Sequence, residues 1–292
     1  MKVSYYPGCT LKTKAKNLED AAVASMAALG VEFEELPRWN CCGAVHSLAE
    51  DDLIHQVAPV RDLIRVQDQG NRKVVTLCSM CYNTLARANL LMRDDAVKRK
   101  TINDFMDEET DYHGEVEVLH FLTFLRDEIG WDKLREMVKV PLNGLKVAPY
   151  YGCTLLRPRN VSIEPPGNPQ LFGEFLEVLG AKPVPFPAES LCCGSYQILA
   201  NPDAALNVAA TIVEWAAKSG AEALVLSCPL CEFNLGKKQK ELLEKSKVTQ
   251  EIPTYYFTQL LAVAMGLGPE ASRFDLNEVA SAALLKSKSI AI

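Results

Sequence analysis

The sequence predicts an α/β protein built from two duplicated, pseudo-symmetric domains, each a mostly parallel sheet with flanking helices. Three observations support this fold class. Short apolar segments alternate with longer segments whose apolar residues have helical spacing. The landmarks of the first half recur about 150 positions later. The length of 292 residues, 48% of them hydrophobic, suffices for two domains. We expect these domains at residues 1–145 and 146–292.

The expected strands are mostly β-branched or apolar and are bounded by Gly, Pro or Cys, as buried strands are. They lie at residues 2–6, 32–36, 73–77, 146–150, 182–186 and 223–227. The expected helices carry apolar residues at helical intervals, and several end in Gly, a common helix C-cap. They lie at residues 18–29, 53–69, 170–179 and 204–218. This alternation favours parallel pairing of the strands within each half.

The repeat is carried by matched motifs in the same order. Tyr-Tyr-Pro-Gly-Cys-Thr-Leu at 5–11 returns as Tyr-Tyr-Gly-Cys-Thr-Leu at 150–155. Cys-Cys-Gly at 41–43 returns at 192–194, and Cys-Ser-Met-Cys at 78–81 returns as Cys-Pro-Leu-Cys at 228–231. The intervals between the cysteine motifs are 31 and 35 residues in the first half and 38 and 34 in the second. Such an ordered set indicates duplication.

Composition narrows the class of protein. The 31 Lys and Arg against 37 Asp and Glu give a net charge of −6, which argues against a nucleic-acid binder held by phosphate contacts. The longest apolar stretches are far shorter than the roughly 20 residues that cross a bilayer, so we expect no membrane span. The first residues lack the apolar core of a signal peptide. We therefore expect a cytoplasmic protein.

Ten cysteines in a reducing compartment indicate metal or redox chemistry, because structural disulfides are rare there. Each CxxC pair alone would also suit a thioredoxin-like dithiol. Structural zinc takes four ligands, commonly from two CxxC-like pairs. Each half instead offers one CxxC, an adjacent pair and a single cysteine, which favours a polynuclear centre. Five thiolates exceed the four of an ordinary iron–sulfur cubane by one. Disulfide, dithiol and zinc remain open as alternatives.

The cysteines are expected to converge although they are far apart in sequence. Cys9, Cys78, Cys153 and Cys228 each follow a predicted strand, and the CxxC pairs open a following helix. In an α/β sheet the strand ends on one side face a common crevice. Helix N-termini there present backbone N–H groups and a partial positive charge, which stabilise a negatively charged cluster. We therefore expect one five-cysteine site in each half.

At these residues the chain resembles the cysteine-rich CCG-domain proteins, whose pattern is a cysteine, then Cys-Cys-Gly, then CxxC. Both copies are complete, and the resemblance covers nearly the whole chain. Within that group it is similar to the catalytic B subunits of heterodisulfide reductases, which in methanogenic archaea reduce the mixed disulfide of coenzyme M and coenzyme B to two thiols. The resemblance implies two noncubane 4Fe-4S clusters with the substrate disulfide between them. The implied metal ligands are Cys9, Cys41, Cys42, Cys78 and Cys81 for one cluster and Cys153, Cys192, Cys193, Cys228 and Cys231 for the other.

The resemblance also implies partners. Related chains commonly carry a fused ferredoxin-like C-x2-C-x2-C-x3-C-P stretch, and none is present in these 292 residues. Electrons are therefore expected from a separate iron–sulfur C subunit, which would in turn receive them from a flavin-containing A subunit, with a hydrogenase as a further candidate. The alternative is an electron-relay subunit of another oxidoreductase complex, which touches no substrate itself.

Several residues near the ligands are weaker candidates. Cations follow the single cysteine of each half and could bind the anionic groups of a substrate, although a solvated loop explains them equally well; they are Lys12, Lys14, Lys16, Arg157 and Arg159. His46 lies four residues after Cys42. It could donate a proton, or it could be a core residue that contacts the cysteine ligands. The charged segment 93–117 is expected to be a solvated face or a docking surface for the electron donor. The segment 276–285 is amphipathic and could also meet a partner.

Overall fold

The computed structural model describes residues 1–44 and 53–292, and within them the chain forms two four-stranded sheets. The strand orders are β2-β1-β3-β4 and β6-β5-β7-β8, so the second sheet repeats the topology of the first. All the strand pairs are parallel. The predicted α/β class with two duplicated, mostly parallel sheets is therefore confirmed.

The strands are short, as buried parallel strands often are. Their bounds are β1 Lys2–Tyr5, β2 Glu32–Glu35, β3 Lys73–Thr76, β4 Glu117–His120, β5 Lys146–Pro149, β6 Lys182–Pro183, β7 Ala223–Leu226 and β8 Thr254–Tyr256. Six of them coincide with predicted strands, although β6 is only two residues long. The edge strands β4 and β8 were not predicted.

Helices connect the strands and cover the sheets. Their bounds are α1 Lys16–Ala28, α3 Val57–Asp68, α4 Ser79–Asp94, α5 Ala96–Phe105, α6 Phe121–Phe124, α7 Trp131–Glu136, α8 Leu171–Val178, α9 Pro202–Lys218, α10 Pro229–Glu232, α11 Gln239–Glu244, α12 Phe257–Ala264, α13 Pro269–Ser272 and α14 Ser281–Ser287. Shorter helical turns of other pitch are η1 Leu53–Gln56, η2 Leu125–Ile129, η3 Arg159–Val161, η4 Ser195–Gln197, η5 Phe233–Lys237 and η6 Phe274–Leu276. The four predicted helices correspond to α1, η1 with α3, α8 and α9. The charged segment 93–117 contains α5.

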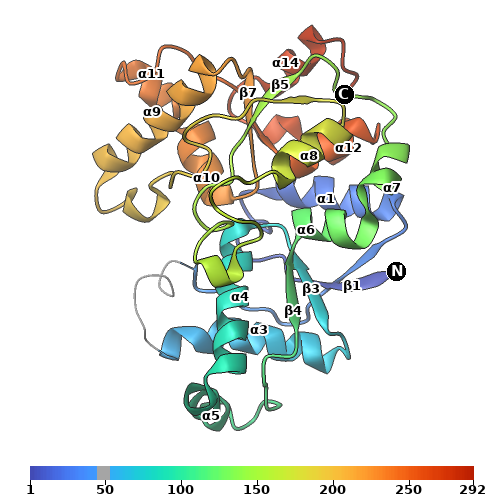
Figure 1. Cartoon of the computed structure of the whole chain (residues 1–292), viewed down its shortest axis with the longest axis vertical. Coiled ribbons are helices and arrows are strands. Elements are labelled where there is room, and N and C mark those ends of the chain that lie inside the picture. Colours follow the sequence, from blue (N-terminus) through green and yellow to red (C-terminus); the bar gives the residue numbers. More distant parts are fainter. Residues whose placement is uncertain (45–52) are drawn as a thin grey trace.

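Helices of the two halves interlock between the sheets. Helix α1 of the first half packs along α12 of the second, and α8 of the second half packs on α6 of the first. Figure 1 shows these helices lying in the middle of the molecule, with β3 and β4 on one side and β5 and β7 on the other. The central contact joins the rings of Phe121 and Phe257, 5.7 Å apart, which are the first residues of α6 and α12. Each half therefore covers part of the other.

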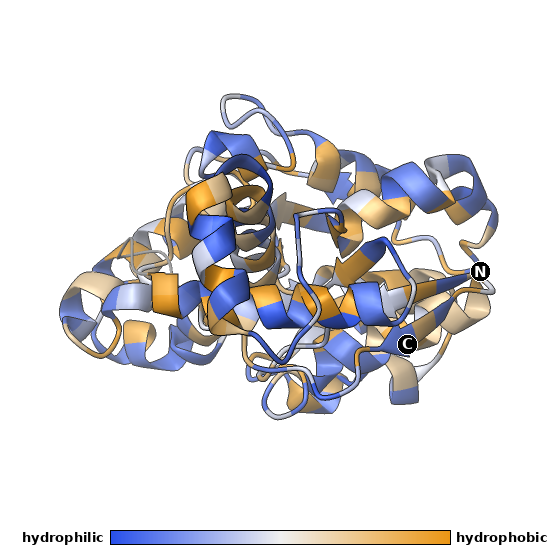
Figure 2. Ribbon diagram, turned by 90° about the horizontal axis from the view of Figure 1, so that it is seen from below, coloured by the Kyte–Doolittle hydropathy of each residue, from blue (hydrophilic) through white to orange (hydrophobic). Residues whose placement is uncertain are grey.

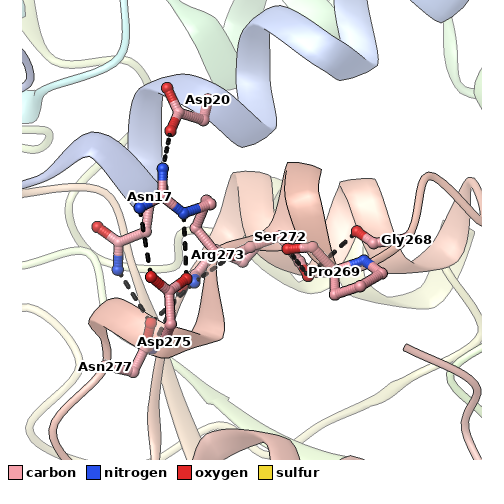
Figure 3. A network of polar contacts seen from close by, with 9 residues as sticks. Asn17, Asp20, Gly268, Pro269, Ser272, Arg273, Asp275 and Asn277 are labelled. Carbon is pink, nitrogen blue, oxygen red and sulfur yellow. Dashed lines mark hydrogen bonds and ion pairs between the residues drawn. The ribbon is translucent and has the colours of Figure 1, made fainter.

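A polar network fastens the outer end of this junction (Figure 3). The Arg273 guanidinium, in the turn after α13, pairs with Asp20 of α1 at 2.7 Å and with Asp275 at 3.1 Å. Asn17 of α1 donates to the Asn277 side-chain oxygen at 2.9 Å. The N-terminal helix is thus tied to a loop some 250 residues further along the chain, which fixes its position over α12.

One large hydrophobic core runs through both halves, because most of the buried side chains of both sheets and of the interlocked helices form a connected cluster. A small separate cluster of Ala21, Ala262 and Ala271 lies between α1, α12 and α13. In Figure 2 hydrophobic and hydrophilic segments alternate around the peripheral helices, as expected where one helix face packs on a core. No helix among residues 1–44 and 53–292 is both long and apolar enough to span a membrane.

Candidate metal centre

The same structural elements position the cysteines in both halves. Cys9 and Cys153 lie four residues after the ends of β1 and β5. Cys78 and Cys228 are the N-cap residues of α4 and α10, in extended conformation after β3 and β7. In each CxxC pair the backbone N–H of the second cysteine donates to the sulfur of the first. The expected placement of CxxC at strand-to-helix junctions is therefore confirmed.

The five cysteines of the first half form a continuous row of thiols, which we call the first set. The Sγ atoms of Cys9 and Cys41 are 3.5 Å apart, and those of Cys42 and Cys81 are 3.7 Å apart. Neighbouring side-chain interactions join Cys41 to Cys42 and Cys81 to Cys78. The row thus runs from Cys9 at the surface to Cys78 inside the molecule.

The second set repeats this row with its own cysteines. The Sγ atoms of Cys193 and Cys231 are 3.4 Å apart. Cys153 interacts with Cys192, Cys192 with Cys193, and Cys231 with Cys228. The backbone N–H of Gly194 also donates to the Cys192 sulfur at 3.4 Å. The duplication in sequence is therefore a duplication of geometry.

The two sets adjoin at their inner ends. The Cys78 and Cys228 thiols lie close enough that Cys228 is the largest influence that lowers the pKa of Cys78. The contact is extended by Ser79 and Ser227, whose hydroxyl oxygens are 2.7 Å apart. The two rows therefore meet at Cys78 and Cys228 and together form one row of ten cysteines.

Exposure follows the same gradient in both sets. The single cysteine and the first cysteine of the doublet are the most accessible, and the other three are buried. Cys9 and Cys41 are exposed, whereas Cys153 and Cys192 are half-buried. Each set is thus open to solvent at one end and dry at the end where it meets the other.

Three of the ten thiols have a pKa that is lowered, which favours the thiolate, the form in which cysteine binds metals. Hydrogen bonds from neighbouring thiols lower the pKa of Cys42, Cys78 and Cys192. The pKa of Cys81 and Cys231 is raised by hydrogen bonds with neighbouring thiols and by burial. The pKa of the other five thiols is raised as well, so the row can hold both ionised and protonated sulfur atoms.

The geometry differs from a mononuclear metal site. Within the part of the chain that the structure describes, no three or more Cys, His, Asp or Glu side chains have the spacing to hold a single metal ion. All ten cysteines are free thiols. The sulfur atoms come as rows of close pairs rather than as one tetrahedral shell, and such donors suit a centre of several metal atoms better than one zinc ion.

Tyr6 and Tyr150 support the doublets, a role that the sequence analysis missed. Each lies three residues before the single cysteine of its half. The Tyr6 hydroxyl donates to the carbonyl oxygen of Asn40 at 2.7 Å, and that of Tyr150 donates to the carbonyl oxygen of Leu191 at 2.6 Å. Both acceptors immediately precede a doublet. The tyrosines were visible as repeat landmarks, but only the structure connects them to the doublet loops.

His120 also supports a cysteine motif, and its role was not predicted from the sequence. It ends β4 opposite Thr76, as Tyr256 ends β8 opposite Leu226, so these two residues are equivalent in the repeat. The His120 Nε2 lies 3.2 Å from the carbonyl oxygen of Leu77, which precedes Cys78, and its Nδ1 accepts the N–H of Leu122. Complete burial lowers the pKa of His120 to about 3. It therefore holds the CxxC junction as a neutral side chain.

The predicted cationic residues differ in whether their charged groups are already paired. The Lys12 ammonium is held between Glu19 and Glu35, at 2.7 Å from each, and is not available to an added anion. The positive charge of Arg157 lies close enough to Cys192 to lower the pKa of that thiol. Its guanidinium has one weak contact, 3.4 Å from the Ser190 carbonyl oxygen. Lys14, Lys16 and Arg159 are exposed. His46 lies outside the described residues.

The chain has two α/β halves, each with a parallel sheet, that bring ten free cysteines into one row. This arrangement defines a duplicated cysteine-rich metal-binding protein. More specifically, the chain belongs to the CCG cysteine-rich domain family, whose model matches residues 3–86 and 147–236. The predicted resemblance to the CCG-domain family is confirmed. Membership implies that the chain carries iron–sulfur clusters.

Two relatives cover nearly the whole chain. The 8-methylmenaquinol:fumarate reductase membrane anchor subunit of Wolinella succinogenes is 33% identical over 266 residues, 90% of this chain and 92% of that protein. The B subunit of the ferredoxin:CoB-CoM heterodisulfide reductase of Methanosarcina mazei is 29% identical over 282 residues, 95% of this chain and 94% of that protein. The chain is thus similar to subunits of two different reductases.

A solved structure has the same fold. The crystal structure of a hypothetical protein from Helicobacter pylori superposes with a TM-score of 0.75 at 13% sequence identity. The match covers 94% of this chain and 51% of that one, so the chain spans about half the length of this structural relative. At this identity the similarity concerns the fold alone.

Proposed function

We propose that the chain is the catalytic iron–sulfur subunit of a heterodisulfide reductase and that each cysteine set holds one noncubane 4Fe-4S cluster. The ligands of one cluster are Cys9, Cys41, Cys42, Cys78 and Cys81, and those of the other are Cys153, Cys192, Cys193, Cys228 and Cys231. The substrate is the disulfide of coenzyme M and coenzyme B. It takes up two electrons and two protons and leaves as two thiols.

The observation that carries this proposal is the meeting of the two sets at Cys78 and Cys228. A disulfide has two sulfur atoms to separate and needs two electrons, and the clusters supply one electron each when bound. Two equivalent sites that adjoin can address both sulfur atoms of one substrate. Two sites on opposite surfaces of the protein could not.

In this proposal the protein gives the substrate access to the two cysteine sets and supplies a positive charge that binds it. The exposed and half-buried ends of the sets, at Cys9 and Cys41 and at Cys153 and Cys192, provide access from solvent. Arg157 lies beside the second of these openings and is suited to bind an anionic group of the substrate. The buried inner ends exclude water from the junction of the sets, where a low dielectric strengthens electrostatic interactions.

Electrons must come from another protein in this proposal. The relatives are subunits of multi-subunit reductases, and these 292 residues contain no ferredoxin-like motif. We propose an iron–sulfur C subunit as the direct donor. A flavin-containing A subunit would supply that donor, and a hydrogenase would be the source of electrons in a larger complex.

A second candidate is an electron-relay subunit that touches no substrate. It is favoured by the relative from Wolinella succinogenes, which belongs by name to a fumarate reductase and has the higher of the two identities. In that case the row of sulfur atoms would carry electrons from one set to the other, and a partner subunit would hold the active site.

One experiment separates the two candidates. The protein is purified without oxygen, its iron and acid-labile sulfide are counted per chain, and the reduced protein is mixed rapidly with the heterodisulfide. The catalytic proposal expects two clusters per chain, release of two thiols per disulfide and a new cluster-based paramagnetic signal. Reoxidation without thiol release, or no reaction until a partner subunit is added, would favour the relay. Zinc without sulfide would contradict both.

A further inference from the structure

A cavity of about 360 Å³ with mostly apolar walls lies between the two halves, beside the second CxxC motif. The first half lines it with Thr10, Lys14 and Ala15, and the Thr10 hydroxyl lies 3.7 Å from the Cys9 sulfur. The second half lines it with the helix that begins at the CxxC motif and with the end of β8, through Pro229, Leu230, Glu232, Phe233, Lys237 and Tyr256. The cavity therefore adjoins cysteines of both sets.

One buried carboxyl group lines this cavity without a partner. Glu232 is 6% exposed, and its carboxylate has no hydrogen bond or ion pair with any residue among 1–44 and 53–292. A Cβ atom on Gly236 would lie 2.6 Å from the Glu232 Oε1, so the carboxyl group occupies space that only a glycine leaves. A buried carboxylate without a hydrogen-bond donor is costly. The cavity is therefore suited to a ligand that brings a donor.

The cavity exists where the second half departs from the internal repeat. At the start of α4, Tyr82 replaces Glu232 and Asn83 replaces Phe233. The side chains of these two residues donate three hydrogen bonds to carbonyl oxygens of segment 154–161, at 3.0, 2.8 and 2.7 Å. These bonds close the equivalent space in the first half. The helix α4 is also continuous, whereas α10 passes into the π-helical turn η5, an element that is frequent at functional sites.

Two lysines that line the cavity can bind an anion. Lys14 is exposed, and its ammonium group pairs with no carboxylate in the described part of the chain. The Lys237 ammonium is 3.8 Å from the Glu278 carboxylate, near the upper limit for an ion pair. Charge-assisted hydrogen bonds from such groups to an incoming anion are strong. The lining thus combines apolar walls, one buried acceptor and two cations.

We propose that this cavity binds an elongated amphipathic anion. Its hydrocarbon chain packs on the apolar walls, an N–H or O–H group within the chain donates to the Glu232 carboxylate, and its anionic end binds Lys14 and Lys237. The inference rests on the proposed function in that this anion is taken to be one arm of the substrate disulfide. The cavity adjoins both cysteine sets, so an arm bound there can reach them. Arg157 then serves the anionic group of the other arm.

The test is calorimetric titration of the purified, cluster-containing protein with two probes that contain no sulfur. N-hexanoylglycine has an acyl chain, an amide N–H and a carboxylate, whereas nonanoate has a chain of the same length and a carboxylate but no N–H. We expect the wild type to bind N-hexanoylglycine about tenfold more tightly, because a hydrogen bond to a charged group contributes more than one between neutral groups.

Variants of the lining separate the contributions. Glu232→Leu removes the acceptor and keeps the wall apolar, so the preference for N-hexanoylglycine disappears while nonanoate still binds. Lys14→Ala and Lys237→Ala weaken the binding of both probes. Lys240→Ala is the matched control and leaves both affinities unchanged, because Lys240 is exposed on α11 and does not line the cavity.

Equal affinities of the wild type for the two probes, no binding of either, or a preference that survives in Glu232→Leu would overturn the proposal. If that variant does not fold, the wild-type protein still decides. A diazirine at the end of the acyl chain labels the cavity lining, as mapped by mass spectrometry, and labels confined to other residues contradict the site.

The sulfur-free probes keep this inference apart from the proposed function. If the probes bind as expected and the heterodisulfide is not reduced, the catalytic proposal fails and the cavity stands. If the heterodisulfide is reduced and neither probe binds, the cavity assignment alone fails. Displacement of N-hexanoylglycine by the heterodisulfide supports the binding of a substrate arm, and a probe that stays bound overturns it.

Discussion

At the residue scale, the ten sulfur atoms are ordered by contacts between cysteines that are far apart in the sequence. The row depends on side-chain rotamers and on the contact between Cys78 and Cys228, 150 positions apart. Neither follows from spacing along the chain. The supporting hydrogen bonds of Tyr6 and Tyr150 were equally hidden, because their acceptors are backbone carbonyl groups. That the ten cysteines are the metal ligands stays a prediction.

Gly8 shows how closely the first set is packed. It has a φ of +74°, and a Cβ atom there would lie 2.9 Å from the Cys81 sulfur. We expect Gly8→Ala to displace Cys81 and to lose about half of the iron and acid-labile sulfide per chain, because the second set is untouched. Gly70→Ala is the matched control, since Gly70 has a φ of +75° and nothing lies within 4 Å of its added Cβ. Equal iron contents in the two variants would contradict the ligand role of Cys81.

Arg157 provides a test of substrate binding. Removal of a guanidinium that binds a substrate anion costs about 1.4 kcal/mol or more, so we expect Arg157→Ala to raise the KM for the heterodisulfide about tenfold. The value of kcat should change less. Lys12→Ala is the control, because Lys12 is already paired with two carboxylates. If Lys12→Ala has the larger effect on KM, the anion lies in the first half instead.

Asp62 gives the protein a pH-dependent stability. Burial raises the pKa of its carboxyl group to about 7, although Arg65 partly opposes this. An unfolded Asp has a pKa of about 3.9. Between these values the folded protein binds more protons than the unfolded chain, so the free energy of unfolding falls as the pH rises, by at most about 1.4 kcal/mol per pH unit.

Asp62→Asn should remove this slope while keeping an acceptor for the Asn40 N–H, which Asp62 binds at 2.8 Å. The measurement is urea unfolding at pH 5 and pH 7.5 under anaerobic conditions, with the exposed Asp68→Asn on the same helix as the control. A variant whose stability falls with pH as steeply as that of the wild type would show that Asp62 is not responsible.

At the element scale, six of the strands were predictable because turn residues or cysteines bound them and most of them are apolar. β4 and β8 were missed because each follows a polar segment. Short edge strands carry little periodicity of their own, and pairing with a central strand decides their conformation. The register of β3 with β4 and of β7 with β8 is nevertheless the same in the two halves.

An aromatic contact between Phe121 of α6 and Phe257 of α12 links the two halves at the junction. The Phe257 ring is fully buried and lies within 6 Å of the rings of Phe121, Phe172, Phe175 and His120. We expect Phe257→Ala to lower the free energy of unfolding by about 3–5 kcal/mol. Phe105→Ala on α5, where the side chain is 61% exposed, should change it by less than about 0.5 kcal/mol. Similar losses in denaturant unfolding would refute the central role of Phe257.

At the scale of the whole molecule, the duplicated fold was predictable from the repeat, but the interlocking of the halves was not. Periodicity tells which face of a helix is apolar and says nothing about which sheet covers it. The sheet β2-β1-β3-β4 lies before residue 146 and the sheet β6-β5-β7-β8 after residue 145, whereas α1 packs on α12 and α6 packs on α8 across the halves. The domain limits 1–145 and 146–292 stay a prediction. The cytoplasmic location also stays a prediction.

Interlocking predicts that neither half is stable alone. A fragment of residues 1–145 would leave the faces of α1 and α6 uncovered, and a fragment of residues 146–292 would do the same to α8 and α12. We expect each fragment to unfold without a cooperative transition, and the two together to regain one transition in circular dichroism. A sharp thermal transition in either isolated fragment would establish independent domains.

The packing of α1 on α12 has a consequence for biosynthesis. The Leu18 carbonyl oxygen accepts the Thr258 hydroxyl at 2.9 Å, across 240 residues of sequence. At translation rates of roughly 5–20 residues per second, α12 leaves the ribosome roughly 10–50 s after α1. During that time the nascent first half lacks the helix that covers α1. The apolar surface of α1 that packs on α12 therefore stays exposed on the ribosome for this interval.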